Sequence, residues 1–138
     1  MTGIFQHSID AKGRLFIPAR LREELGNVFY VTLSTEKCLW AHSPESWERM
    51  MERIKAMSRT QQIKMRPLFS HATKCEPDGQ GRILLPKALR DQVGLESSVT
   101  VVGVFDRAEL WDTETWAAVD VSESTTENIE QVFLELDF

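Results

Sequence analysis

The sequence has little of what disulfide-bonded, membrane-spanning or secreted proteins need. Its 138 residues include two cysteines, Cys38 and Cys75, too few for a disulfide framework or a four-ligand cysteine zinc motif. Apolar runs are short, as at residues 15–17 and 83–85, so we expect no segment that crosses a bilayer. The first residues lack a basic stretch followed by an apolar one. We therefore expect a cytoplasmic protein of one domain or two very small ones.

Charge is distributed unevenly along the chain. Sixteen bases and 21 acids give a net charge of −5, which by itself argues against a nucleic-acid partner. The segment from Arg49 to Lys74, however, holds seven bases and one acid, so its local field is positive. This segment is either a solvated basic helix face or a surface for a polyanion. Residues 117–138 hold six acids and no base: Asp120, Glu123, Glu127, Glu130, Glu135 and Asp137.

The chain contains an internal repeat. Residues 10–22 (DAKGRLFIPARLR) recur 68 positions later as residues 78–90 (DGQGRILLPKALR). Leu-Trp at 39–40 returns at 110–111, and Ser-Pro-Glu-Ser-Trp at 43–47 is matched by Asp-Thr-Glu-Thr-Trp at 112–116. The matched features keep the same order in both halves, which indicates two copies of one structural unit. All four tryptophans occupy equivalent places in the two copies, a pattern typical of core or interface packing.

Each copy begins with a strand that leads into a tight turn. Asp10 and Asp78 open the turns, because an aspartate carboxylate accepts backbone N–H groups two residues further on. Gly13 and Gly81 supply the positive φ that such turns require. The preceding strands are predicted over residues 4–9 and 71–76, and a buried apolar strand follows each turn.

Proline and glycine punctuate the rest of each copy. Pro18 and Pro86 suit the first position of a short helix, and Gly26 and Gly94 suit its end. Further strands are predicted at 28–33, 37–40, 99–104 and 108–111, and Ser43 and Asp112 are expected to cap the helices that follow.

A helical segment separates the copies, and another ends the chain. Trp47, Met50, Met51, Ile54 and Met57 form one helical stripe, typical of core packing. Thr60 is expected to cap a second helix, which Pro67 should kink or stop. In the tail, Ile129, Val132, Phe133 and Leu136 share a helical face, so the tail either docks on a neighbour or is disordered. The predicted organisation is a first module at 1–47, a connector at 48–70, a second module at 71–118 and an acidic tail at 119–138.

The paired Asp-x-x-Gly-Arg turns, each followed by an apolar strand, a proline and a short helix, resemble the MraZ family. The Leu-Trp-Asp at 110–112 and the segment at 70–78 extend the resemblance to residues 1–118. It implies an α+β fold of mixed β-strands with short helices, in which two AbrB-like swapped-hairpin modules form one pseudo-twofold β-barrel. It also implies a bacterial, nucleoid-associated transcriptional regulator that binds double-stranded DNA at tandem promoter repeats of the division-and-cell-wall gene cluster. Such a regulator assembles as a homo-oligomeric ring of about eight or more subunits.

The resemblance places the DNA contacts on the two turns. A two-stranded β-ribbon fits the major groove, and the planar fork of arginine matches guanine O6 and N7. We expect Arg14 and Arg82 to read bases, while the other cations position the DNA backbone: Lys12, Arg20, Arg22, Lys87 and Arg90. Gln80 stands where the first turn has Lys12, which makes the second turn less positive.

Simpler roles compete for these arginines and lysines. Arg14 and Arg82 could instead form ion pairs with the aspartates of their own turns. Arg20 lies four residues before Glu24, and Lys87 lies four before Asp91, a spacing that suits ion pairs on a helix.

Two other classes of function remain as alternatives. The acidic amphipathic stretch at 124–138 would suit an antitoxin-like or scaffold protein that binds a protein partner. The pairs His71 and Cys75, and Cys38 and His42, could suggest a metalloenzyme. However, a spacing of four along a strand separates side chains by about 13 Å. No phosphate-binding or nucleophile motif appears, so we expect no enzyme, metal, cofactor, small-molecule substrate or membrane partner.

Overall fold

The computed structural model describes residues 1–123 and 126–137. Its strands are β1 (Ile4–Ser8), β2 (Arg14–Phe16), β3 (Phe29–Leu33), β4 (Leu39–His42), β5 (Thr73–Cys75), β6 (Arg82–Leu84), β7 (Ser98–Val104) and β8 (Arg107–Asp112). Its helices are α1 (Ala19–Leu25), α2 (Pro44–Lys55), α3 (Arg59–Lys64), α4 (Arg66–His71), α5 (Lys87–Val93), α6 (Thr113–Glu123) and α7 (Thr126–Glu135). The predicted α+β class is confirmed.

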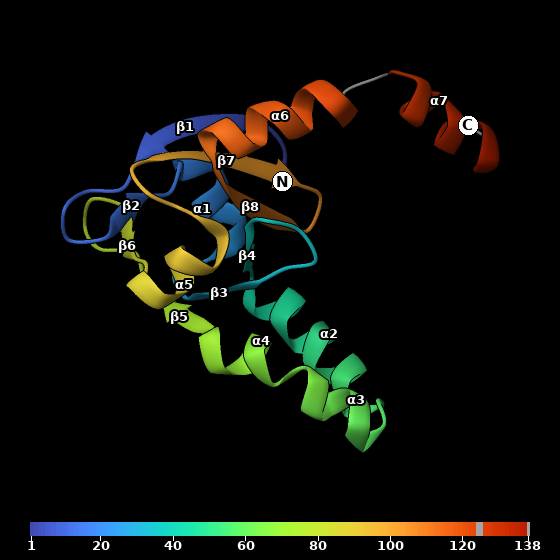
Figure 1. Ribbon diagram of the computed structural model, residues 1–138, viewed down its shortest axis with the longest axis horizontal. Helices are drawn as coiled ribbons and strands as arrows, with labels where there is room; N and C mark the ends of the chain where they lie inside the picture. Colours follow the sequence, from blue (N-terminus) through green and yellow to red (C-terminus); the bar gives the residue numbers. More distant parts are fainter. Residues whose placement is uncertain (124–125, 138) are drawn as a thin grey trace.

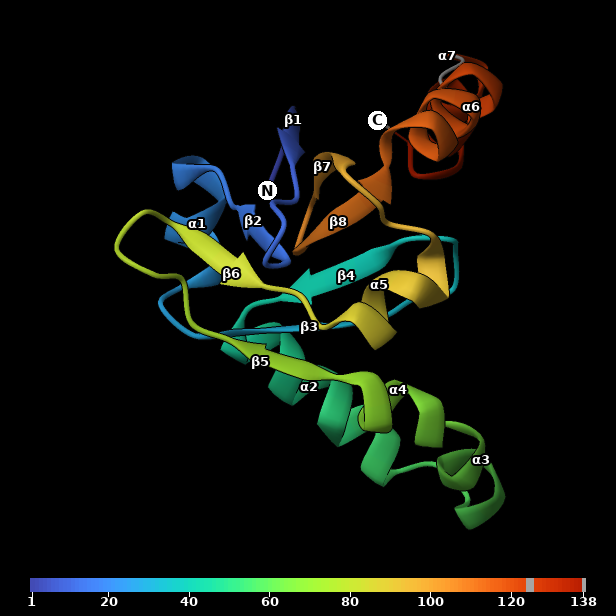
Figure 2. The same cartoon turned by 60° about the vertical axis from the view of Figure 1, so that its left-hand side comes forward.

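The main sheet has six antiparallel strands in the order β1-β7-β8-β4-β3-β5 (Figure 1). Strands β2 and β6 pair separately as a short antiparallel ribbon, which Figure 2 shows beside α1. In the described residues the sheet ends at β1 on one side and at β5 on the other. The strands therefore do not form a closed barrel, and the predicted barrel is not confirmed.

The two repeats exchange strands. The first strand of the first repeat, β1, pairs with β7 of the second, with Ile4 opposite Val102. The first strand of the second repeat, β5, pairs with β3 of the first, with Phe29 opposite Cys75. Strands β4 and β8 join the two hairpins at the centre of the sheet. Each repeat thus completes the sheet of the other, in a pseudo-twofold arrangement.

One hydrophobic core serves both repeats. After Arg14 and Arg82, every second apolar residue of the strand is almost fully buried, and so are the inward faces of α1 and α5, whereas Leu84 is 60% exposed. Packing these side chains together removes the apolar surface of both copies from water at once. The equivalent buried residues are Leu15, Ile17, Leu21 and Leu25 in the first copy, and Ile83, Leu85, Leu89 and Val93 in the second.

The helix boundaries follow local sequence rules, with three corrections. Pro18 and Pro86 lie one position earlier than predicted, as N-cap residues of α1 and α5. Ser58, not Thr60, caps α3, because Ser58 and Gln61 form a reciprocal capping box. His71 is the last residue of α4 and is not part of a strand, and β5 begins only at Thr73.

Other terminus predictions are confirmed. Ser43 Oγ accepts the Ser46 N–H at 3.2 Å at the start of α2, and an Asp112 carboxylate oxygen accepts the Thr115 N–H at 3.1 Å. Gly26 and Gly94 are the C-caps of α1 and α5. Helix α3 ends at Lys64 and helix α4 starts at Arg66, which is the break predicted near Pro67.

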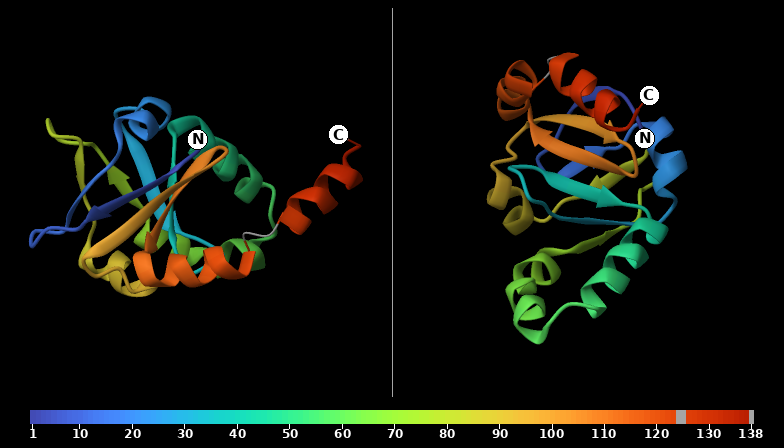
Figure 3. Two further views of the ribbon diagram at one scale, coloured as in Figure 1. Left: turned by 90° about the horizontal axis from the view of Figure 1, so that it is seen from above. Right: turned by 90° about the vertical axis from the view of Figure 1, so that its right-hand side faces the viewer.

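Helices α6 and α7 extend the chain beyond the sheet. Helix α6 packs on β7 and β8, and Trp116 in α6 lies 5.7 Å from Trp111, measured between ring centroids. Helix α7 projects away from the sheet, which Figure 3 shows from two further directions. The apolar residues of α7 are exposed. The division at residues 47, 70 and 118 stays a prediction.

Candidate nucleic-acid interface

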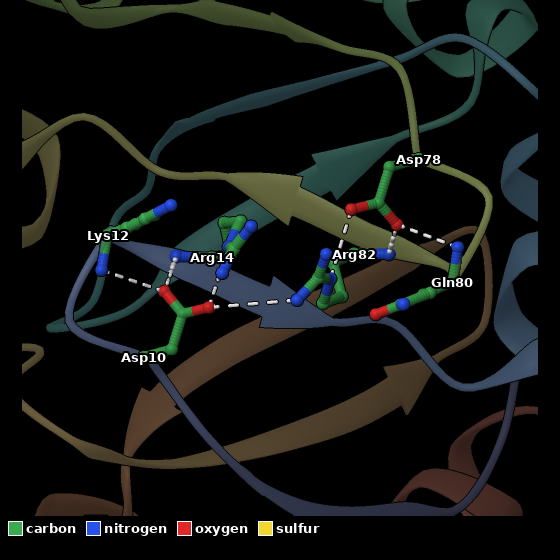
Figure 4. A network of polar contacts seen from close by, with 6 residues as sticks. All are labelled: Asp10, Lys12, Arg14, Asp78, Gln80 and Arg82. Carbon is green, nitrogen blue, oxygen red and sulfur yellow. Dashed lines mark hydrogen bonds and ion pairs between the residues drawn. The ribbon is translucent and has the colours of Figure 1, made fainter.

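The two repeat turns have the same hydrogen bonds (Figure 4). In the first, Asp10 Oδ1 accepts the backbone N–H groups of Lys12 and Arg14, each at 2.9 Å. In the second, Asp78 Oδ1 accepts the N–H groups of Gln80 and Arg82, also at 2.9 Å. Gly13 and Gly81 adopt φ values of +82° and +78°. In both turns, therefore, the aspartate accepts backbone N–H groups and the glycine has a positive φ.

The aspartates also orient the two arginines. Arg14 Nε donates to Asp10 Oδ2 at 2.7 Å, and Arg82 Nε donates to Asp78 Oδ2 at 3.0 Å. A terminal nitrogen of Arg82 lies 3.9 Å from Asp10 Oδ2, so the first turn reaches the arginine of the second. The ion pairs considered as the simpler role are therefore present. The arginine side chains still lie at the surface, 32% and 27% exposed.

The electrostatics of both turns favour the charged carboxylate. The backbone N–H of Arg14 is the main cause that lowers the pKa of Asp10 to about 2, with further contributions from the Arg14 side chain and the Lys12 N–H. The N–H of Arg82 likewise lowers the pKa of Asp78. Hydrogen bonds to the ionised form hold each carboxylate negative, so each guanidinium keeps its partner at neutral pH.

The β2–β6 ribbon displays these arginines on one face. Leu15 pairs with Ile83 and both point into the core, since they are 0% and 1% exposed. Because side chains alternate along a strand, the flanking residues share the outer face. There Arg14 lies opposite Leu84, and Arg82 lies opposite Phe16. The outer face thus carries two guanidinium groups and two apolar side chains, of which Leu84 is 60% exposed.

Arg22 and Arg90 support the turn of the opposite repeat. Arg22 Nε donates to the Ile17 carbonyl at 2.8 Å, and a Cβ on Gly81 would lie 2.7 Å from Arg22 Cζ. Arg90 Nε donates to the Leu85 carbonyl at 3.0 Å, and a Cβ on Gly13 would lie 3.2 Å from a terminal nitrogen of Arg90. This reciprocal contact was not predicted, because it joins residues that lie far apart in the sequence.

The remaining predicted cations lie on exposed surface. Lys12 is exposed at the tip of the first turn. Arg20 is exposed, and among the described residues it has no ion pair, since Glu24 lies instead 3.4 Å from the amino group of Met1. Lys87 forms the ion pair with Asp91 that the spacing suggested, at 2.8 Å. The structure therefore brings Lys12, Arg14 and Arg82 to the turns, with Arg20 and Lys87 on the adjoining helices.

The histidines and cysteines show no arrangement typical of metal ligands. Across residues 1–123 and 126–137, no three histidine, cysteine, aspartate or glutamate side chains come close enough to hold a metal ion. Burial raises the pKa of the Cys38 and Cys75 thiols to about 12, which disfavours the thiolate that binds metals. None of the helices in the described residues is both long and apolar enough to cross a membrane.

A buried carboxylate that the sequence analysis did not single out ties the repeats together. Glu109 is 5% exposed and accepts hydrogen bonds from the indole N–H groups of Trp40 and Trp111, each at 3.1 Å. Arg107 donates to the same carboxylate at 3.0 Å. Glu109 therefore links a tryptophan of each repeat, and its charge is compensated within the fold.

The sequence is similar to those of known proteins. The family model described as "MraZ protein, putative antitoxin-like" matches residues 1–66 and 68–134. A protein named transcriptional regulator MraZ from Heliobacterium modesticaldum is 45% identical over 118 residues, which cover 83% of this chain and 82% of that protein. A protein of the same name from Ligilactobacillus salivarius is 37% identical over 139 residues, covering 98% of this chain and 97% of the relative.

Proposed function

The chain belongs to the MraZ family, and on that premise we propose that it is a transcriptional regulator that binds double-stranded DNA sequence-specifically through its β2–β6 ribbon. Its site is a promoter with tandem short repeats, in the division-and-cell-wall gene cluster that the family resemblance implies. The protein acts as a nucleoid-associated cytoplasmic regulator and not as an enzyme, and it requires no cofactor.

The observation that supports this proposal is the convergence of both repeat turns on one ribbon. Arg14 and Arg82 lie on the same outer face, and both are within 3.9 Å of a single oxygen of Asp10. A two-stranded ribbon is narrow enough to enter the major groove of B-DNA. One copy alone would present one guanidinium, whereas the paired turns present two to adjacent base pairs.

The carboxylate partners are compatible with base recognition. Asp10 and Asp78 engage Nε of each arginine, and an arginine reads guanine O6 and N7 end-on with its two terminal amino groups. The ion pair fixes the direction of the fork before binding, which reduces the side-chain entropy lost on recognition. The apolar Leu84 and Phe16 on the same face suit contact with thymine methyl groups.

The other cations position the DNA. Lys12, Arg20 and Lys87 are exposed beside the ribbon and contact phosphates. Arg22 and Arg90 hold the turns through the Ile17 and Leu85 carbonyls, and their terminal groups complete the phosphate contacts. Gln80 replaces a second Lys12, so the first turn makes the stronger electrostatic contact.

Self-assembly raises the affinity of so small a site. One ribbon covers few base pairs, so a single subunit binds weakly. In a closed ring of about eight or more subunits, each bound ribbon raises the effective concentration of the next. Tandem repeats spaced by about one helical turn allow several ribbons to bind the same face of the duplex.

Arg14→Ala tests the proposal. The variant should lose about 1–3 kcal/mol of binding free energy per ribbon on promoter DNA, because one bidentate base contact disappears. Fluorescence anisotropy titrations at one fixed salt concentration measure this loss on the upstream region of the gene cluster and on a shuffled duplex. Arg14→Lys should retain binding to the shuffled duplex and lose the preference for the promoter, since lysine keeps the charge without the fork.

Arg59→Ala is the matched control. Arg59 is an exposed arginine on α3, outside the ribbon. Its substitution by alanine removes the same charge as Arg14→Ala. Its substitution should leave the preference for the promoter unchanged. Wild-type affinity and preference in Arg14→Ala and Arg82→Ala together would contradict the proposed site.

A further inference from the structure

A hollow of about 570 Å³ lies between α2, β4 and the tip of the β7–β8 hairpin. Its wall is apolar and rich in methionine, with Met50, Met57 and Met65 beside Ile54 and Trp40. Methionine side chains adapt their shape, and they are common where a groove receives an apolar helix face. We call this hollow the α2 groove. The volume falls in the range of about 300–1,000 Å³ that is usual for binding pockets.

Arginine side chains form part of the wall of the α2 groove. Arg49, Arg53 and Arg107 contribute to its wall, against one carboxylate, Asp106. Arg49 lies 4.0 Å from Asp106, and Arg107 pairs with the buried Glu109, whereas Arg53 has no ion pair among the described residues. Burial lowers the pKa of His42 to about 4, so the histidine in the wall is neutral near pH 7. The groove is therefore apolar inside, and Arg53 is the cation in its wall that remains available for an incoming carboxylate.

Helix α7 has the complementary character. Ile129 and Val132 lie at i and i+3 on one face, and they are 56% and 49% exposed. Leu136, directly after the last residue of α7, continues this stripe because its N–H still donates to the Val132 carbonyl, and it is 64% exposed. On a helical wheel, Glu130 flanks this stripe on one side and Glu135 on the other. An apolar stripe with a carboxylate on each side matches an apolar groove that presents the arginine Arg53.

From this complementarity we infer that α7 of one subunit docks in the α2 groove of a second copy of the same chain. Helix α7 and helix α2 lie on opposite sides of the sheet in both views of Figures 1 and 2. The arm formed by α6 and α7 leads away from the groove of its own subunit and presents the stripe to a neighbour. Arg53 faces Glu130 of the incoming helix.

The contact is head-to-tail. Each subunit contributes its α7 to one neighbour and binds the α7 of another neighbour in its α2 groove. Repetition of this contact builds a ring when the rotation between subunits closes. The inference rests on the self-assembly part of the proposed function and names the surfaces that produce it. It does not involve the DNA-contacting ribbon, whose residues are absent from both docking surfaces.

Two substitutions in α7 of the full chain separate docking from general effects on the tail. Val132→Asp places a charge in the stripe, whereas Leu134→Asp makes a similar change at a residue that is 82% exposed and off the stripe. Multi-angle light scattering over a concentration series should show that Val132→Asp raises the concentration for half-assembly by roughly tenfold or more. Leu134→Asp should leave the concentration unchanged, and circular dichroism verifies that helix content is retained.

Charge reversal tests the groove itself. Arg53→Glu should weaken assembly, and adding Glu130→Lys to the same chain should restore it. Arg59→Glu, with the same charge change on α3 outside the groove, should have no effect. Recovery by the paired reversal identifies Arg53 and Glu130 as neighbours in the assembly, which a general loss of stability would not produce.

Crosslinking distinguishes a neighbour's groove from the subunit's own. Chains with Val132→Cys and chains with Met50→Cys are mixed and treated with a short bismaleimide, while the buried native thiols stay unreactive. Docking between copies gives a product of two chains, and the Leu134→Cys chain gives much less. The inference is overturned if the wild type is monomeric, if Val132→Asp assembles normally, or if crosslinks form only within one chain. Normal assembly of Val132→Asp would leave the proposed DNA site and ring intact.

Discussion

A single aspartate performs two tasks in each turn. Oδ1 of Asp10 shapes the turn by accepting two backbone N–H groups, and Oδ2 directs the Arg14 guanidinium. The first task follows from the local sequence, because aspartate commonly accepts N–H groups two residues on. The second task was open from sequence alone, where an ion pair and a DNA contact were alternatives. The geometry allows both, since the pair uses Nε and leaves the side chain about one third exposed.

His42 should make stability depend on pH. Its Nε2 lies 2.9 Å from Thr32 Oγ1. The Thr32 hydroxyl donates its hydrogen to the Leu33 carbonyl, so in the neutral imidazole Nε2–H is the donor to Thr32 Oγ1. Burial lowers the pKa of His42 from 6.5 to about 4, so the unfolded chain binds a proton first as pH falls. Stability should be full above pH 6.5 and decrease from there to pH 4, by about 1.4 kcal/mol per pH unit at most.

Urea unfolding at intervals between pH 4 and pH 7.5 measures this dependence. His42→Gln keeps a side-chain N–H donor without a titrating group, so the difference in unfolding free energy between variant and wild type should shrink as pH falls. The other two histidines are common to both proteins and cancel in that difference. A difference that stays constant across the range would show that His42 is protonated equally in both states.

At the scale of elements, local rules predicted more than pairing rules. The caps at Ser43 and Asp112 and the break near Pro67 are confirmed, because each depends on residues within one turn of chain. The capping box at Ser58 was visible in the sequence through Gln61 and was overlooked in favour of Thr60. The pairing of β1 with β7 could not be predicted by these rules, since it joins residues about a hundred positions apart.

Gly81 should be intolerant of a side chain for two separate reasons. Its φ is +78°, and an added Cβ would lie 2.7 Å from Cζ of Arg22. Gly81→Ala should therefore destabilise the fold by about 1–3 kcal/mol. Thermal unfolding measures the effect. Gly79 in the same turn is the control, because a Cβ there has no heavy atom within 4 Å and its φ is not positive.

Gly79→Ala should change stability by about 0.5 kcal/mol or less. Equal effects of the two alanine substitutions would show that neither the backbone conformation nor the Arg22 contact constrains the second turn. Arg22→Ala in the Gly81→Ala background separates the two causes. It should recover only the part of the loss that comes from the close contact, because the positive φ remains.

At the scale of the molecule, the two repeats should fold as one unit. Strands β1 and β5 each pair with a strand of the opposite repeat, and Glu109 joins Trp40 to Trp111. A fragment of residues 1–70 therefore lacks β7 as the partner of β1 and lacks β5 beside β3. We expect fragments 1–70 and 71–138 to show little fixed structure as separate monomers, and to regain native-like spectra when mixed.

Nuclear magnetic resonance spectra of each fragment and of the mixture provide the measurement. Well-dispersed amide signals from monomeric fragment 1–70 alone would contradict the prediction, and would support the division into modules at residue 47 as independent folding units. Urea unfolding of the whole chain should likewise be a single transition by tryptophan fluorescence and by circular dichroism, because the tryptophans lie in both halves.

The exchange of β1 and β5 between the two repeats has a consequence for the evolutionary origin of the protein. A protein with one copy of this repeat would have a sheet edge without a neighbouring strand, and a first strand without a sheet to join. Two such chains would satisfy each other as a twofold pair. Gene duplication and fusion would then preserve that pair inside one polypeptide, and the second turn would be free to exchange its lysine for Gln80 while the first kept Lys12.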